Sequence, residues 1–338
     1  MKIFESLPLL INGDDLSRED MSFVVKEILE GVSTDSQIIA FLSALSAKGE
    51  SVDEIVGAAE VMRKFSQKVN VSKDGLVDTC GTGGSGIGIF NVSTTASFIA
   101  SACGARIAKH GNRTATRNSG SADLLEQAGV SLNLKPDQVA RCINEVGIGF
   151  MYAPAHNNAM KHVAGPRKEM GVKTIFNILG PLTNPASAPN QVMGVYDKKW
   201  LKPMAEVLKE LGSKHVLVVH SKDHLDEISI AEETYVAELI DGGVIEYKIC
   251  PEDFGFLRHP IKKLLVKSPE HSLLVAKEAL QGTNEAAAAM VAMNAGATLY
   301  AANVVDDISQ GVLLAKEAIE DHRGLEKLNE LAAFSQSL

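Results

Sequence analysis

The sequence lacks the features that mark membrane proteins and disulfide-stabilised secreted proteins. No uninterrupted apolar stretch reaches 18 residues, so no membrane-spanning helix is expected. The first ten residues lack the basic start and the small-residue cleavage site of a signal peptide. Cysteine is scarce and shows no C-x-x-C spacing, which indicates neither a disulfide framework nor a zinc site: the four are Cys80, Cys103, Cys142 and Cys250. We therefore expect a cytoplasmic protein.

Basic residues are fewer than acidic residues. Lys and Arg number 33 against 42 Asp and Glu, which gives a formal net charge of −9. Nucleic-acid binders gain most of their affinity from cations that neutralise phosphates, so this balance argues against that class. It does not exclude a small phosphorylated ligand, because a few backbone N–H groups and cations can hold one.

A length of 338 residues exceeds the usual size of one hydrophobic core, and the pattern along the chain predicts two unequal domains. Residues 1–70 show helical periodicity only, with capping signals at Ser17 and Ser51 and a helix from about Asp35 to Lys48 that stops at Gly49. From residue 71 to 338, short apolar runs alternate with amphipathic segments. This alternation predicts an α/β domain with a mostly parallel central sheet. The expected strands are Leu76–Thr79, Arg106–Ala108, Val192–Tyr196, Val216–His220 and Val244–Ile249, and the Ala-rich segment Asn284–Asn303 is expected to be the longest helix.

The densest chemical signal is a glycine-rich loop that follows the first expected strand. Five glycines fall within eight residues, at positions 81, 83, 84, 86 and 88, and Asn91-Val-Ser-Thr94 then opens a helix. Glycines let backbone N–H groups approach an anion, and a helix N-terminus favours negative charge. A flexible loop with an ordinary N-cap is the alternative, but the order strand, loop and capped helix favours a phosphate site. No Gly-Lys-Ser/Thr follows, so this is not a Walker loop.

Two further polar clusters follow expected strands. Lys109-His-Gly-Asn-Arg113 comes after Arg106–Ala108 and leads to a helix that starts near Ser119–Asp123, which suits a pyrophosphate or a 5′-phosphate. Asp226 and Glu227 come after Val216–His220. An acidic pair is usually a solvated surface, but beside two phosphate sites it is the natural place for Mg²⁺, which prefers one or two carboxylates plus substrate phosphate.

A fourth block, residues 151–185, contains His156, His162 and Arg167. A spacing of six between the histidines fits no zinc pattern. The planar fork of Arg167 suits a carboxylate of the substrate, although pairing with Glu169 or a helix end is an equal alternative at this point.

Taken in order, these blocks resemble the anthranilate phosphoribosyltransferase family, which has the nucleoside phosphorylase type III fold. The motifs that carry the resemblance cover nearly the whole chain: Gly81-Thr-Gly-Gly84, Asn91-Val-Ser-Thr94, Lys109-His-Gly-Asn-Arg113, Gly120-Ser-Ala-Asp123, Gly180-Pro-Leu-Thr-Asn-Pro185, Leu225-Asp-Glu-Ile-Ser229 and Asn294-Ala-Gly-Ala-Thr-Leu-Tyr300. The resemblance implies that the helical domain is completed by a segment near 166–185. It also implies a homodimer and a Mg²⁺-dependent transfer of phosphoribosyl from phosphoribosyl pyrophosphate to anthranilate, with no covalent nucleophile and with charge stabilised by Lys109 and Mg²⁺.

The same resemblance implies roles for individual residues. Mg²⁺ would be held by Ser93, Asp226 and Glu227. Anthranilate would face Gly81, His110, Asn112 and Arg167. The phosphoribosyl donor would contact Gly81, Gly84, Ser85, Asn91, Val92, Ser93, Thr94, Lys109, His110, Gly111, Asn112, Arg113, Arg117 and Ser121.

This sequence departs from the family pattern at three places and leaves two rival functions to weigh. Ser85 stands where Asp is usual, Thr116-Arg117 where Ser-Ser is common, and His224 where Gly is usual. Pyrimidine nucleoside phosphorylases share the fold, but they are usually longer. A non-catalytic nucleic-acid-binding paralogue is disfavoured by the acidic balance and by the presence of Asn112 and Arg167.

Overall fold

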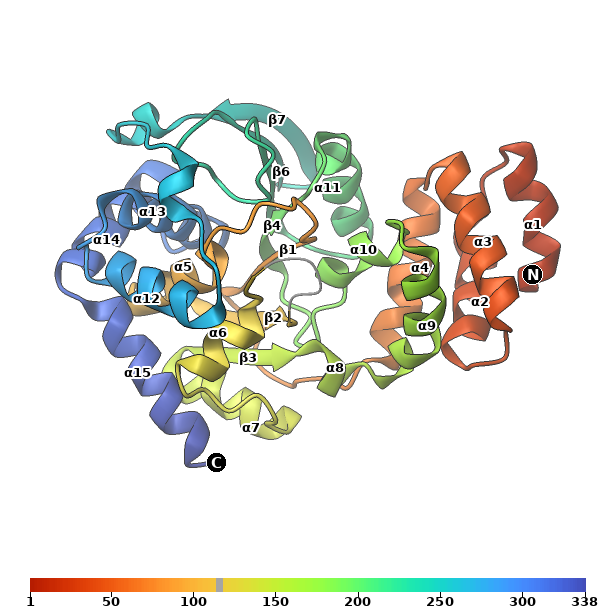
Figure 1. Cartoon of the computed structure of the whole chain (residues 1–338), viewed down its shortest axis with the longest axis horizontal. Helices are drawn as coiled ribbons and strands as arrows, with labels where there is room; N and C mark the ends of the chain where they lie inside the picture. Colours follow the sequence, from red (N-terminus) through yellow and green to blue (C-terminus); the bar gives the residue numbers. More distant parts are fainter. Residues whose placement is uncertain (114–117) are drawn as a thin grey trace.

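The computed structural model describes residues 1–113 and 118–338, and it extends from a helical unit at the N-terminal end to an α/β unit (Figure 1). The expected helical start is confirmed. Ser17 caps the second helix by accepting a hydrogen bond from the Asp20 N–H, and Gly49 ends the third with a φ of 93°. The first helix contains an exposed Pro8, which obscured it in the sequence. The four helices are α1 (Ile3–Asn12), α2 (Arg18–Leu29), α3 (Asp35–Lys48) and α4 (Val52–Phe65).

One seven-stranded sheet forms the centre of the α/β unit, in the order β3-β2-β1-β4-β5-β6-β7. The first five strands in this order are parallel, and β6 and β7 add an antiparallel edge. The predicted fold class, with a mostly parallel sheet, is therefore confirmed. The strands are β1 (Leu76–Gly81), β2 (Arg106–Gly111), β3 (Ile148–Tyr152), β4 (Asn190–Gly194), β5 (His215–Ser221), β6 (Thr234–Ile240) and β7 (Gly243–Ile249).

The sequence located five of these strands and missed β3 and β6. It also ended β2 too early, at Ala108. Lys109, His110 and Gly111 pair with Phe150, Met151 and Tyr152 of β3, and this pairing carries the strand three residues further. Lys109 and His110 are therefore side chains of a buried strand and not of the loop that follows it. The third expected strand, Val192–Tyr196, corresponds to β4 and lies two residues earlier than predicted, at Asn190–Gly194.

The inner strands β4 and β5 are buried on both faces, whereas the edge strand β7 is largely exposed. Consecutive residues of a strand point to opposite faces. In β5, Leu217 and Val219 enter one hydrophobic core together with the C-terminal helices. Val216 and Val218 enter the other core, which includes the N-terminal helices. The same core takes in residues of α9 (Lys161–Met170) and α10 (Phe176–Leu179). Consistent with this, α9 contacts α2 and α3, while α10 contacts α4 (Figure 1).

The remaining helices cover the sheet. The longest is α13, as predicted from its Ala-rich sequence, and it meets α14 so closely that a Cβ on Gly311 would lie 2.4 Å from the Gly296 carbonyl oxygen. Among the described helices, none combines the length and the apolar character needed to cross a bilayer. The bounds of these helices are α5 (Val92–Ala102), α6 (Ser121–Gln127), α7 (Pro136–Arg141), α8 (Ala153–His156), α11 (Leu201–Glu210), α12 (Pro269–Leu280), α13 (Glu285–Ala301), α14 (Ile308–Glu320) and α15 (Arg323–Gln336).

Candidate active site

The predicted polar motifs meet at the carboxyl ends of the parallel strands β1, β2, β4 and β5. Ligands of open α/β sheets bind in the crevice outside this edge. The glycine-rich loop leaves β1 and takes left-handed backbone conformations at Gly83, Gly84 and Gly86, with φ between 64° and 80°. Residues with a Cβ rarely adopt this conformation, which explains the glycines.

The acidic pair lies against the glycine-rich loop and the start of α5. The Gly83 N–H donates to Asp226 Oδ2 at 3.1 Å. The Ser93 N–H, in the first turn of α5, donates to Glu227 Oε1 at 3.3 Å. A helix N-terminus favours negative charge, so both the helix and the loop stabilise these carboxylates. Residues 134 positions apart in the sequence thus form one oxygen-rich cluster.

Lys109 enters the same cluster from β2. Its side chain is buried, and its Nζ contacts the carbonyl oxygen of Thr79 and lies 3.5 Å from Ser93 Oγ. Burial lowers the pKa of Lys109, while Asp78, Cys80 and Glu227 act in the opposite direction. The cation is therefore held by oxygen atoms at the edge of the sheet, within reach of the start of α5.

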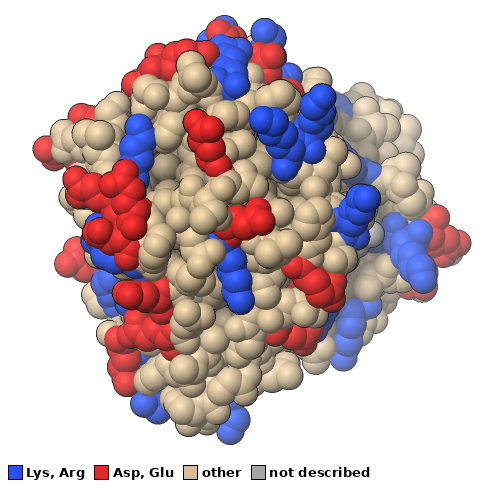
Figure 2. Space-filling model, turned by 60° about the vertical axis from the view of Figure 1, so that its left-hand side comes forward, with Lys and Arg blue, Asp and Glu red and all other residues tan. Residues whose placement is uncertain are grey.

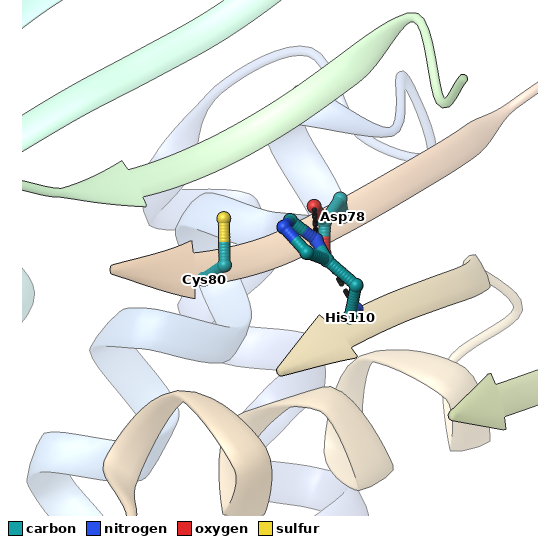
Figure 3. A group of neighbouring side chains, drawn as sticks. All are labelled: Asp78, Cys80 and His110. Carbon is teal, nitrogen blue, oxygen red and sulfur yellow. Dashed lines mark hydrogen bonds and ion pairs between the residues drawn. The ribbon is translucent and has the colours of Figure 1, made fainter. Parts of the chain in front are cut away.

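His110, the next residue of β2, points toward Asp78 on the neighbouring strand β1 (Figure 3). Its Nδ1 is 2.6 Å from Asp78 Oδ2, and its Nε2 is 2.8 Å from the carbonyl oxygen of Gly180. Burial acts to lower the pKa of His110, but the Asp78 carboxylate outweighs it and the net shift is upward. His110 thus joins two strands to the segment that follows α10.

Asp78, Cys80 and His110 have possible ligand atoms within 4.8 Å of one another, so they could be taken for a metal site (Figure 3). The chemistry does not suit Mg²⁺, which prefers oxygen donors. Burial raises the pKa of the Cys80 thiol well above its usual value, and the thiolate is the metal ligand. The oxygen-rich cluster of Ser93, Asp226 and Glu227 is the better match.

Two matches to family models cover most of the chain. Residues 6–66 match the helical bundle domain of a glycosyl transferase family, and residues 73–324 match the a/b domain of that family. The anthranilate phosphoribosyltransferase of Ectopseudomonas mendocina is 52% identical, over 99% of this chain and 97% of the relative. That of Cellvibrio japonicus is 51% identical over the full length of both. The chain belongs to the anthranilate phosphoribosyltransferase family.

Solved structures of the anthranilate phosphoribosyltransferase family share this fold over nearly the whole chain. The Thermus thermophilus enzyme superposes with a TM-score of 0.92 at 39% identity, covering 98% of this chain and 99% of its own. The Saccharomyces cerevisiae enzyme, in complex with PRPP and Mg, superposes with a TM-score of 0.91 at 26% identity, covering 99% and 98%.

Several residues of the family motifs are engaged with other parts of the protein. Arg113 pairs with Asp123 at 2.9 Å and with Glu126 at 2.8 Å, so its guanidinium is directed to α6. The backbone oxygen of Asn112 accepts from Ser121 Oγ at 3.3 Å. A Cβ on Gly111 would lie 2.1 Å from the same Ser121 oxygen, so a side chain there would displace the Ser121 hydroxyl.

The start of α5 offers fewer groups than its sequence suggests. Val92 and Thr94 are buried, and the Val92 N–H already donates to the Phe90 carbonyl. Ser85 lies in the glycine-rich loop between Gly84 and Gly86. Arg117 lies outside the described residues.

Arg167 lies in α9 with its guanidinium carbon 5.8 Å from the centre of the Phe176 ring. Burial lowers the pKa of Arg167. Within residues 1–113 and 118–338, no ion pair joins it to Glu169, and no hydrogen bond joins it to Gly81, His110 or Asn112. The structure therefore leaves its guanidinium available to a ligand, but does not join it by hydrogen bonds to the other residues predicted to face anthranilate.

Sequence reasoning missed Ser272, which ties α12 to Asn91 at the start of α5. Ser272 Oγ donates to Asn91 Oδ1 at 2.8 Å and accepts from the Asn91 N–H at 3.2 Å, and Ser119 Oγ donates to the same Asn91 oxygen at 2.7 Å. Ser272 lies in α12, 181 residues after Asn91, and no local pattern marks it. Lys173 was missed as well. Its Nζ donates to the Gly84 carbonyl at 3.0 Å and lies 3.5 Å from the centre of the Tyr196 ring.

Proposed function

We propose that this chain transfers the phosphoribosyl group of phosphoribosyl pyrophosphate to the amine of anthranilate, giving N-(5-phosphoribosyl)anthranilate and pyrophosphate. The observation that carries the proposal is the meeting of Asp226 and Glu227 with the Gly83 and Ser93 N–H groups at the carboxyl edge of the sheet. The chain is also about half identical, over nearly its full length, to anthranilate phosphoribosyltransferases, which supports the same reaction.

The donor site follows from the same edge. Backbone N–H groups of the glycine-rich loop and the start of α5 would hold the phosphates, and Lys109 adds a buried cation. The proposed donor contacts are Gly81, Gly84, Ser85, Asn91, Val92, Ser93, Thr94, Lys109, His110, Gly111, Asn112, Arg113, Arg117 and Ser121. Because the Val92 and Asn91 N–H groups are engaged here, the loop must adjust if they are to contact the donor.

Ser93, Asp226 and Glu227 would hold Mg²⁺, since they offer two carboxylates and one hydroxyl at the place where the pyrophosphate would lie. The ion supplies positive charge that stabilises the leaving pyrophosphate. For anthranilate, Arg167 would bind the carboxylate through its planar fork, beside Gly81, Asn112 and the ring of His110. Both nitrogens of His110 face protein oxygens, so it would meet anthranilate through the ring edge.

The reaction needs no covalent nucleophile from the protein. The anthranilate nitrogen attacks C1 of the ribose while the bond from C1 to the pyrophosphate oxygen breaks. The protein contributes by orienting the two substrates and by placing Lys109 and backbone N–H groups where negative charge accumulates. Such preorganised charge and positioning are large terms in enzymatic rate enhancement.

The assembly and location of the chain are also proposals. We propose a homodimer formed through the helical unit: Phe4, Pro8 and Ile11 of α1 are exposed and follow one helical face, and Phe23 of α2 is exposed as well. Analytical ultracentrifugation would test it, with a monomeric mass as the contrary result. The four cysteines are unpaired thiols, which supports a cytoplasmic location.

We also propose a domain boundary near residue 70, with residues 166–185 completing the helical domain. The support is that α9 contacts α2 and α3, and α10 contacts α4, so this segment packs on the N-terminal helices. Limited proteolysis should cut near residue 70 and leave residues 166–185 protected; preferential cleavage inside 166–185 would argue against this division.

The alternative of nucleic-acid binding gains no support from the surface in Figure 2. On this face Lys and Arg side chains are interspersed with Asp and Glu, and they form no continuous basic stripe. An electrostatic footprint for nucleic acid would be a basic patch or stripe.

The experiment is a fluorescence assay for loss of anthranilate in the presence of phosphoribosyl pyrophosphate and Mg²⁺. The matched pair of variants is Asp226→Ala/Glu227→Ala, which removes the proposed metal carboxylates, and Glu320→Ala/Asp321→Ala, which removes two adjacent exposed carboxylates at the end of α14. We expect donor- and metal-dependent loss with the wild type and with the second variant only. A folded wild type with no activity across a wide Mg²⁺ range would refute the proposal, and phosphorolysis of thymidine would then favour a nucleoside phosphorylase.

A further inference from the structure

The hydrogen bonds around His110 determine its protonation state. Its Nε2 faces the Gly180 carbonyl oxygen, which can only accept, so Nε2 must carry a proton. Its Nδ1 lies 2.6 Å from Asp78 Oδ2, which can only accept while the carboxyl group is ionised. The Asn184 amide nitrogen is farther from Nδ1, at 3.5 Å, and donates to the Ala108 carbonyl at 2.8 Å instead. If Asp78 is ionised, both ring nitrogens donate and His110 is an imidazolium cation.

The surroundings of Asp78 favour the ionised form. Its Oδ1 accepts from the His110 backbone N–H at 3.3 Å, and its Oδ2 accepts from Gln191 Nε2 at 3.3 Å. The orientation of the Gln191 amide is fixed, because Nε2 also lies 2.8 Å from the Pro181 carbonyl, which accepts only. Burial acts to raise the pKa of Asp78, but the charge and side-chain hydrogen bond of His110, a hydrogen bond from Asn184 and the charge of Lys109 outweigh it, and the net shift is downward.

This charged pair is part of a set of contacts that fastens one segment to the sheet. Gly180 and Pro181 follow α10, and they are held by His110 of β2 and Gln191 of β4. Three residues later, Asn184 Nδ2 donates to the Ala108 carbonyl of β2 at 2.8 Å. All of these side chains are buried. Side-chain hydrogen bonds therefore fix the segment 180–184 to the central strands. The segment directly follows α10, and α9, which carries Arg167, precedes α10 in the chain.

We propose that Asp78 is a positioning residue: by keeping His110 doubly protonated it holds the Gly180 carbonyl, and so sets the place of α9, α10 and Arg167 over the edge of the sheet where the acceptor binds. The kinetic part of this inference depends on the proposed function. A neutral His110 keeps only one ring N–H. If the remaining proton is on Nδ1 and donates to Asp78, the lone pair of Nε2 faces the Gly180 oxygen. The hydrogen bond to the segment 180–184 is then lost.

The pH dependence follows from the raised pKa of His110. The link is present below the usual pKa of a histidine and is lost as pH rises through the higher pKa of the folded protein. The other ionisable groups near the ring are Asp78 and Cys80 on β1, Lys109 on β2 and His156 on α8. Asp78 favours the cation, whereas Lys109 and His156, when charged, disfavour it.

The test compares Asp78→Asn with Glu238→Gln in the full-length protein. Asn keeps a hydrogen-bond acceptor for Nδ1 and removes the charge. Glu238→Gln is the matched control, because Glu238 of β6 makes the same kind of buried pair with His215 at 2.9 Å. His215 is the first residue of β5, so this pair lies away from the carboxyl ends of the parallel strands. For the wild type we expect ¹⁵N resonances of His110 in the imidazolium range for both nitrogens at pH 7, and a neutral ring in Asp78→Asn.

Two further measurements address positioning rather than charge. In Asp78→Asn the amides of residues 180–186 should exchange hydrogen faster, and the KM for anthranilate should rise roughly tenfold or more, as expected for loss of a hydrogen bond to a charged group, with kcat changing less. The wild-type KM for anthranilate should rise as His110 loses its proton, whereas Asp78→Asn should already show the raised KM at pH 7. The control should show neither change.

A neutral His110 in the wild type at pH 7 would overturn the inference. The inference would also be overturned if Asp78→Asn and Glu238→Gln showed the same amide hydrogen exchange and the same KM for anthranilate. If Asp78→Asn does not fold, a wild-type KM that stays constant while NMR shows His110 deprotonating would overturn it equally. A wild type without transferase activity would refute the proposed function, while the NMR and exchange results would still decide whether the charged link exists.

Discussion

Gly194→Ala is the substitution that most directly tests how the sheet places the acidic pair. Gly194 is the last residue of β4, and a Cβ there would lie 1.8 Å from the backbone oxygen of Asp226 and 2.5 Å from its backbone carbon. Backbone atoms cannot rotate aside. To reach ordinary contact at 3.4 Å, the Asp226 backbone must retreat by about 1.6 Å, the difference between the two distances.

We expect Gly194→Ala to lower both the folding stability and the catalytic rate, and the two effects can be estimated separately. Forcing extra atoms into a packed site typically costs about 1–3 kcal/mol of folding free energy. A displacement of about 1 Å in a catalytic group can lower the rate roughly 100-fold. We therefore expect Gly194→Ala to fold with reduced stability, to lose at least that factor in kcat/KM, and to need more Mg²⁺ for half-maximal activity.

The assay is the anthranilate fluorescence assay over a Mg²⁺ titration, with urea denaturation measured in parallel. Gly243→Ala is the control, because it makes the same change in the same sheet at a position whose nearest atom is 3.7 Å away. The control should keep wild-type activity. If Gly194→Ala matched the wild type in kcat/KM and in its Mg²⁺ requirement, the argument that strand geometry fixes Asp226 would be wrong.

Two smaller predictions concern the loops around the site. His224 is exposed with a φ of 66°, a conformation that costs residues with a Cβ about 1–2 kcal/mol. Glycine removes this strain, but it also lowers the free energy of unfolding by about 0.4–1 kcal/mol because it makes the unfolded chain more flexible. His224→Gly should therefore raise the urea midpoint slightly, and a lower midpoint would contradict the strain argument. Ser272→Ala removes both hydrogen bonds to Asn91 and should cost about 1–3 kcal/mol while raising the KM for the phosphoribosyl donor. Calorimetry and donor kinetics measure the two effects, and an unchanged donor KM would mean that Ser272 supports only the fold.

The sequence identified the parts of the site that depend on local chemistry. The glycine-rich loop, Asn91-Val-Ser-Thr94 and the pair Asp226 and Glu227 each follow a strand, and parallel strands bring their carboxyl ends to one edge, so their meeting could be predicted. The end of β2 could not be predicted in the same way. It depends on pairing with β3, which itself was missed because Ile148–Tyr152 is a short apolar run without alternation.

Long-range partners account for most of what was missed. β6 contains a buried Glu238, which breaks the apolar pattern of a strand, and its cost is offset by His215 on the neighbouring strand. Nothing within a few residues of Glu238 reveals that partner. Ser272 was missed for the same reason. Arg113 illustrates the converse: its motif suggests a phosphate contact, but in the fold its guanidinium pairs with Asp123 and Glu126.

The position of the acidic pair is in the end a property of sheet register. Gly81 and Gly194 are paired residues at the ends of β1 and β4. A Cβ on Gly81 would lie 2.9 Å from Asp226 Oδ2, and one on Gly194 would overlap the Asp226 backbone, so both strand ends must lack a side chain for Asp226 to lie across them. A slip of one residue would place Met193 or Val195 opposite Gly81 and close that space. The pairing that builds the core therefore also fixes where the carboxylates lie, which is why Gly194, outside the glycine-rich loop, belongs to the chemistry of the site.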